Sequence, residues 1–241
     1  MSKTLIIGKD LPDSLEFCES IAASGRTVFS IAKSEAEASN FESENIFCTT
    51  WNKSSAVSAH TVLIKAETKL EGMDEIIFYF DTNYFCSKYE LDKSEEIASA
   101  VDMMINGYLY ATTELLKRID QKKEKILVSF LLKEYPSKLE TLSSKNGISV
   151  PASGIVSAAQ AAFISIAESF STCVSDRSYL SVLLAKCTQA NEIYKNEKLI
   201  GDWLATSMVS VEAMKNPQTA KQASTWNKVG SKVQTGFSLF K

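Results

Sequence analysis

Histidine and cysteine, whose side chains often bind metals or act in catalysis, are few and scattered in this sequence. His60 is the only histidine, and its neighbours form no recognisable site. The five cysteines include no Cys-x-x-Cys pair and stand at Cys18, Cys48, Cys86, Cys173 and Cys187. Because zinc sites and disulfide frameworks need closely spaced or paired ligands, this pattern predicts neither. We expect no metal, and reduced thiols in a cytoplasmic protein.

Composition and charge exclude further classes of function. The 241 residues carry a formal net charge of −3, with 45% hydrophobic residues and a pI near 5.4. Proteins that bind nucleic acid show a basic face, so we expect no nucleic-acid partner. No apolar run approaches the roughly 20 residues that span a bilayer, and the first ten residues do not form a signal peptide. We therefore expect no membrane segment.

Any reactive group must be positioned by an alternation of apolar strands and helical segments. The expected strands are 4–8, 27–32, 45–50, 74–80, 125–132 and 179–185. The expected helices are Leu15–Ser24, Ser54–Lys69, Ser94–Ile119, Gly154–Thr172 and Glu192–Met214. This rhythm indicates a parallel sheet with helices on both faces, and right-handed crossovers make it doubly wound. The sequence predicts a Rossmann-like, three-layer α/β/α fold.

The chain offers no linker that would separate two large domains. We predict a single domain over residues 1–215 and a polar C-terminal arm or tail over 216–241, where apolar residues become few. The segments 84–93 and 133–153 are expected to be polar and irregular, and 35–44 is polar and short.

The segment Gly154–Thr172 reads as a helix with two faces that can pack. One stripe is apolar, with Val156, Ala159, Phe163, Ile166 and Phe170 at helical spacing. The second face has small side chains, Ala158, Ala161, Ala162 and Ser165. Small residues let a second helix approach closely, so we expect one face to meet the sheet and the other a second subunit.

Several motifs, taken in order, resemble the short-chain dehydrogenase/reductase family over residues 3–210. Gly8 stands at the first glycine of that family's glycine-rich turn, and Gly25 at the glycine before its second strand. The serines at 143 and 144, Gly147 and Pro151 resemble the Ser-Ser…Gly…Pro run ahead of its active-site helix. The run from Val156 to Phe163 then resembles the family's Tyr-Ser-Ala-Ser-Lys-Ala-Ala-Val.

The departures from the family fall where the resemblance implies chemistry. The second and third glycines of the turn become Pro12 and Ser14, and proline has no N–H to offer a phosphate. Residues 78–81, Phe-Tyr-Phe-Asp, replace the family's Asn-Asn-Ala-Gly and are bulky enough to intrude toward the adenosine side. The resemblance implies a catalytic tyrosine and lysine at Val156 and Gln160, neither of which can act as the family's acid/base pair.

Tyrosine and lysine recur at the same spacing elsewhere, as Tyr84/Lys88, Tyr89/Lys93 and Tyr194/Lys198. None of these pairs lies on the helix after the fifth strand, so we interpret them as coincidental.

The resemblance also implies a serine position and cofactor-binding positions. Its serine corresponds to Ser144 by spacing, or to Ser129 if the fifth strand carries it. Gly8 and Lys33 are the candidate cofactor-binding residues, and Lys33 could meet the 2′-phosphate of NADP. The degenerate site therefore consists of Ser144, Val156 and Gln160, and we assign no catalytic residue.

Three hypotheses on function follow. The first is a non-catalytic or highly divergent member of this family, whose Rossmann scaffold binds a ligand or partner and oligomerises. The second is an NAD- or NADP-dependent oxidoreductase with altered active-site residues, in which Ser144, Asp81 or Tyr84 takes a new role. The third is a structural or assembly protein. In each we expect a homodimer or homotetramer built through the helices Ser94–Ile119 and Gly154–Thr172.

Overall fold

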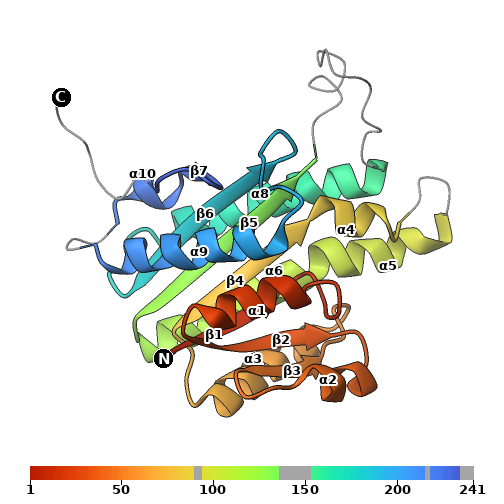
Figure 1. Cartoon of the computed structure of the whole chain (residues 1–241), viewed down its shortest axis with the longest axis horizontal. Coiled ribbons are helices and arrows are strands. Elements are labelled where there is room, and N and C mark those ends of the chain that lie inside the picture. The colour runs from red at the N-terminus through yellow and green to blue at the C-terminus, as the bar shows by residue number, and fades with distance from the viewer. Residues whose placement is uncertain (90–93, 136–152, 215–217, 234–241) are drawn as a thin grey trace.

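A seven-stranded parallel sheet forms the centre of the molecule (Figure 1). The computed structural model describes residues 1–89, 94–135, 153–214 and 218–233, and the statements below concern these residues. The strand order is β3-β2-β1-β4-β5-β6-β7, and every neighbouring pair is parallel. The strands are β1 (Ser2–Ile7), β2 (Arg26–Ala32), β3 (Ile46–Thr50), β4 (Glu75–Asp81), β5 (Ile126–Glu134), β6 (Leu180–Thr188) and β7 (Trp226–Lys228).

Helices cover both faces of the sheet and complete the predicted three-layer Rossmann-like fold. One face packs against α3 (Ala56–Leu70), α6 (Gly107–Lys122) and α8 (Gly154–Cys173). The other packs against α1 (Leu15–Ala23) and α9 (Glu197–Glu212). The central strands are buried on both sides because each face carries its own apolar layer, which explains the nearly continuous apolar runs in the sequence.

The helix α8 lies where the sequence predicts a helix with a packed stripe. Val156, Ala159, Phe163 and Phe170 are buried against the sheet, while Ala161 on the opposite side is exposed. By length and composition alone, α8 is the one described helix that could cross a membrane. The core helix of a soluble protein passes the same test, and the stripe of α8 packs in this core.

The expected single helix over 94–119 is interrupted. A 3-10 turn (Ser94–Glu96) leads into α5 (Ile97–Val101), and a π-helical turn (Asp102–Asn106) follows before α6 begins at Gly107. Gly107 packs closely here, since an added Cβ would lie 3.1 Å from the Cβ of Lys53 and 3.2 Å from the ring of Trp51. Helix α6 therefore approaches the loop after β3 at this point.

Four short elements go beyond the sequence prediction. Helix α2 (Glu35–Phe41) forms in the polar segment after β2, and the Ser34 hydroxyl caps it by accepting from the Glu37 amide. Helix α4 (Thr82–Cys86) extends into the segment expected to be irregular, with Asp81 as its cap. Residues of the expected C-terminal arm form α10 (Ala220–Ala223) and β7, which adds the seventh strand beside β6.

Candidate functional site

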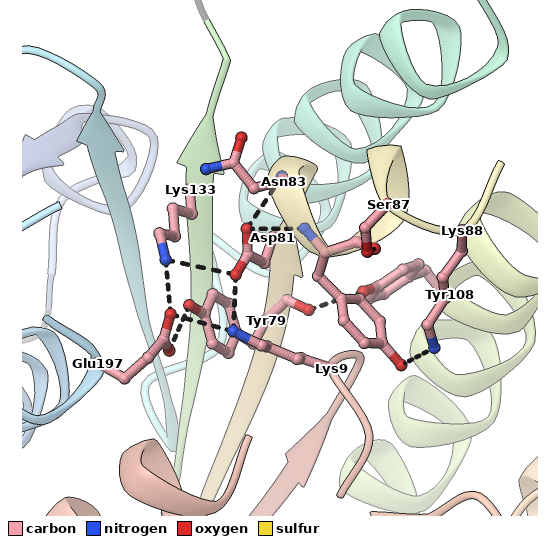
Figure 2. A network of polar contacts seen from close by, with 10 residues as sticks. Lys9, Tyr79, Asp81, Asn83, Ser87, Lys88, Tyr108, Lys133 and Glu197 are labelled. Carbon is pink, nitrogen blue, oxygen red and sulfur yellow. Dashed lines mark hydrogen bonds and ion pairs between the residues drawn. The ribbon is translucent and has the colours of Figure 1, made fainter. Parts of the chain in front are cut away.

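A cluster of four charged side chains lies at the carboxyl edge of the sheet, where Rossmann-like proteins bind their ligands. Lys9 follows β1, Asp81 ends β4, Lys133 lies near the end of β5 and Glu197 begins α9. The Lys9 ammonium donates to Asp81 Oδ2 at 2.8 Å and to Glu197 Oε1 at 3.0 Å. Lys133 donates to the same two oxygens, at 3.4 Å and 2.5 Å (Figure 2). We call these four residues the ionic cluster.

The ionic cluster is buried and balanced in charge. All four residues are buried, with two ammonium groups facing two carboxylates. Burial alone would raise the pKa of Asp81, but Lys9 and Lys133 hold it below its usual value. Burial alone would lower the pKa of Lys9, but Asp81 and Glu197 raise it. Asp81 and Lys9 therefore both stay charged at neutral pH, and the cluster holds the ends of four elements together.

Local structure fixes the two carboxylates. Asp81 Oδ1 accepts from the amides of Asn83 and Tyr84 at 3.0 and 3.3 Å, so one oxygen caps α4 while the other binds the lysines (Figure 2). Glu197 lies in the first turn of α9, and its second oxygen accepts from the Tyr79 hydroxyl at 2.8 Å. Burial, Asp81 and Glu197 raise the pKa of Tyr79 well above its usual value, so this phenol stays protonated.

Gly8 is needed for close packing in this structure. Its φ is +130°, and an added Cβ would lie 1.9 Å from the Tyr79 carbonyl oxygen and 2.5 Å from the Tyr108 hydroxyl. That carbonyl already accepts from the Tyr108 hydroxyl at 2.7 Å. The turn after β1 thus rests directly on the β4 backbone, which accounts for the glycine without a bound phosphate.

The rest of this turn does not fit the pyrophosphate of a dinucleotide. Lys9, Asp10 and Leu11 are buried, and Asp10 is paired with Lys53 at 2.7 Å. The amide of Leu15, first in α1, already donates to the Pro12 carbonyl. A phosphate cradle needs free amides at the helix N-terminus and close backbone approach. Here side chains fill the turn, and both lysines of the ionic cluster are already paired with its carboxylates.

The positions that the family resemblance singles out have structural contacts in this chain. Val156 is fully buried in the first turn of α8. The Gln160 side-chain oxygen accepts from the Thr82 hydroxyl at 2.7 Å and from the Tyr135 amide at 3.1 Å, which ties α8 to α4 and β5. Lys33 pairs with Asp13 at 2.5 Å on the surface. Ser144 lies outside the described residues.

The other candidate positions lie inside the core of the sheet. Ser129 lies within β5, fully buried, and its hydroxyl has no hydrogen-bond partner among the described residues. Phe78 and Phe80 are fully buried and pack with Phe130 and Phe163 in the layer beneath α8, rather than projecting from the sheet edge. Within the described part of the chain, no three potential metal ligands come together.

Sequence reasoning missed three members of the ionic cluster, Lys9, Lys133 and Glu197. A signal for two of them was present, because Lys9 and Lys133 follow directly after apolar runs that were assigned to parallel strands. Charged residues at such positions reach the same sheet edge. Glu197 carried no comparable signal, since it lies inside the segment that was assigned to a helix.

Comparison with known proteins identifies solved structures with a similar fold. No protein-family model and no curated protein matches the sequence. Among solved structures, the chain resembles a 3-ketoacyl-(acyl-carrier-protein) reductase from Brucella melitensis complexed with NADH, with a TM-score of 0.62 over 94% of this chain and 96% of that one. The fold is that of the short-chain dehydrogenases. A short-chain dehydrogenase-type protein from Novosphingobium aromaticivorans gives a TM-score of 0.61 over 87% and 79% of the two chains.

The resemblance to short-chain dehydrogenases is therefore confirmed at the level of the fold. Sequence identity is 12% and 10% in these two alignments, so the likeness shows the fold alone. A shared fold does not carry a shared activity, which must be argued from the residues at the sheet edge.

Proposed function

We propose that this chain is a non-catalytic or highly divergent short-chain dehydrogenase-like protein, which uses the Rossmann scaffold to bind a ligand or partner. The observation that carries this proposal is the ionic cluster. Its salt bridges from Lys9 to Asp81 and Glu197 join the turn after β1 to the end of β4 and the start of α9. A member of the family would bind its dinucleotide at this edge of the sheet. The scattered cysteines agree with a cytoplasmic location.

A nucleotide-binding assay tests this proposal directly. We expect no rise in the unfolding temperature when NAD, NADH, NADP or NADPH is added at millimolar concentration, because a ligand that binds only the native state must stabilise it. An NADH-binding short-chain reductase in the same buffer serves as the positive control. A saturable rise with any of the four nucleotides would contradict the proposal.

The second candidate is an NAD- or NADP-dependent oxidoreductase with altered active-site residues. The comparisons favour this candidate over the first, since the solved structures with the same fold include a reductase complexed with NADH. The nucleotide assay separates the two. Stabilisation by a nucleotide, followed by its oxidation or reduction with a carbonyl or alcohol substrate, would establish the second candidate.

A groove between α6 and α8 supports the proposal of a homo-oligomer. Its volume is about 480 Å³, and its apolar lining includes Ile105, Leu109, Leu116 and Ile166. The exposed side of α8 adds the small residues Ala158, Ala161 and Ser165, which let another helix approach. Two copies of this face can pack on each other about a two-fold axis, as most homodimers do. We therefore propose a homodimer or homotetramer that assembles through α6 and α8.

The dimer is tested by placing a charge on this face. We expect Ala161→Arg to convert the dimer into a monomer with little change in folding stability, because Ala161 is exposed in the single chain. Light scattering measures the mass. Val209→Arg on α9, 54% exposed on the other side of the sheet, is the matched control and should stay dimeric. A wild-type protein that is monomeric at working concentration would refute the homodimer.

A further inference from the structure

The last strand of the sheet covers only part of its neighbour. Strand β7 pairs with β6 over Leu184–Lys186, so the residues of β6 before Leu184 lie at an edge of the sheet (Figure 1). At that edge the Val182 amide donates to the side-chain oxygen of Gln218 at 2.7 Å, and the side-chain nitrogen of Gln218 donates to the Val182 carbonyl at 2.8 Å. The Gln218 side chain thus makes both hydrogen bonds that one residue of an added antiparallel strand would make.

Two hollows lie beside this edge, one on each face of the sheet. Leu180 and Val182 pack in the apolar layer of α8, and on this face they line a hollow of about 220 Å³. Ser181 points to the opposite face, since successive side chains of a strand alternate, and with Glu212 of α9 it lines a hollow of about 430 Å³. Gln218 borders both hollows. An extended chain in place of its side chain would direct alternate residues into the two hollows.

The smaller hollow suits an apolar side chain. Val174 and Ala223 complete its apolar lining. Its charged lining residues, Asp176 and Arg177, are paired with each other at 3.3 Å, and Arg177 is also paired with Asp120 at 2.6 Å. These charges are therefore already balanced at the rim.

The larger hollow suits a basic side chain. The described residues that line it include two carboxylates, Asp74 and Glu212, and one amine, Lys125, which gives a net charge of −1. Burial and the negative charges of Glu75 and Asp74 raise the pKa of Glu212 above its ordinary value. A second cation in this hollow would offset that excess of negative charge.

We propose that the edge of β6 binds an extended segment of a partner protein, in which basic and apolar residues alternate, as an added antiparallel strand in place of the Gln218 side chain. In strand addition, main-chain hydrogen bonds supply affinity and pockets for alternate side chains supply specificity. Proteins cover or block their exposed sheet edges, because such edges pair with other chains. Here Gln218 blocks the edge with a side chain, which a competing strand can displace.

This site is separate from the ionic cluster. It lies at the amino edge of the sheet, whereas the ionic cluster lies at the carboxyl edge. The proposal therefore goes beyond the proposed function, and its failure would leave that function standing.

Two labelled peptides of one composition test the pattern of alternation. The peptide Val-Lys-Val-Lys-Val-Lys alternates, whereas Val-Val-Val-Lys-Lys-Lys has the same charge without alternation. We expect fluorescence anisotropy with the full chain to give at least about tenfold tighter binding of the alternating peptide, equivalent to about 1.4 kcal/mol. Equal affinity for the two peptides would mean that charge alone attracts them, and would overturn the proposal. So would an alternating peptide that does not bind.

Three variants test the place of binding. Gln218→Ala removes the competing amide and should tighten binding of the alternating peptide severalfold. Gln222→Ala, the matched control, removes an amide that bonds to Thr219 instead of β6, and should leave the affinity unchanged. Glu212→Gln should weaken the alternating peptide severalfold, because it removes one of the two carboxylates in the larger hollow. Unchanged or weaker binding by Gln218→Ala would overturn the displacement of Gln218, and an unchanged affinity in Glu212→Gln would overturn the placement of the basic residue.

Discussion

Gly8→Ala is expected to lose more than about 4 kcal/mol of folding stability, an effect that few single substitutions reach. An alanine Cβ would lie 1.9 Å from the Tyr79 carbonyl oxygen, and this obstacle is backbone in the central strand β4. The turn and β4 must separate to admit the methyl group, which breaks the hydrogen bond from the Tyr108 hydroxyl as well. Urea unfolding, followed by circular dichroism, measures the loss, and failure to fold is the extreme of the same result.

Gly25→Ala is the matched control. Gly25 also has a positive φ, of +89°, but nothing lies within 4 Å of its added Cβ. Only the left-handed backbone opposes this alanine, which costs about 1–2 kcal/mol. The difference between the two variants isolates the close approach of the turn to β4. If both variants lose the same free energy, that approach does not account for Gly8.

Most of the sheet was predictable because each strand is short, apolar and buried on both faces. The predicted strand at 74–80 differs from β4 by one residue at each end, and the one at 125–132 extends to Glu134 as β5. A strand that is buried on both faces consists almost entirely of apolar residues, so its residue types alone identify it. The same reasoning gave α8, since its packed stripe has a clear helical period.

The short elements were not predictable from periodicity. Helices α2 and α4 are seven and five residues long, and each depends on a capping side chain, Ser34 or Asp81. Strand β7 has three residues and exists because β6 offers it an edge. An element of one or two turns shows too little repetition in the sequence, so only contacts with the rest of the chain stabilise it.

The ionic cluster could not be read from the sequence for a different reason. Lys9 and Glu197 lie 188 positions apart, and only the strand order brings the end of β1 near the start of α9. The resemblance to the family directed attention to Val156 and Gln160, the positions where residues had been lost. It gave no indication of the residues that occupy the edge of the sheet instead.

Lys9→Met is expected to destabilise the protein by about 3–5 kcal/mol, because removing one partner leaves an uncompensated buried charge. Asp81 and Glu197 would then share only Lys133, and the buried site would carry one net negative charge. Urea unfolding at pH 7 measures the loss. Lys33→Met is the control, since the Lys33–Asp13 pair has side chains 37% and 42% exposed, and such pairs contribute about 0–1 kcal/mol.

A second substitution decides whether charge balance is the cause. Lys9→Met with Glu197→Gln leaves Lys133 paired with Asp81, and the glutamine oxygen can still accept from the Tyr79 hydroxyl. If an unpaired carboxylate causes the loss, this double variant is more stable than Lys9→Met alone, although Glu197→Gln by itself is destabilising. Contacting residues in one network give such non-additive energies. Simple addition of the two single losses would instead mean that Lys9 acts through packing, and that the ionic cluster does not hold the sheet edge by charge.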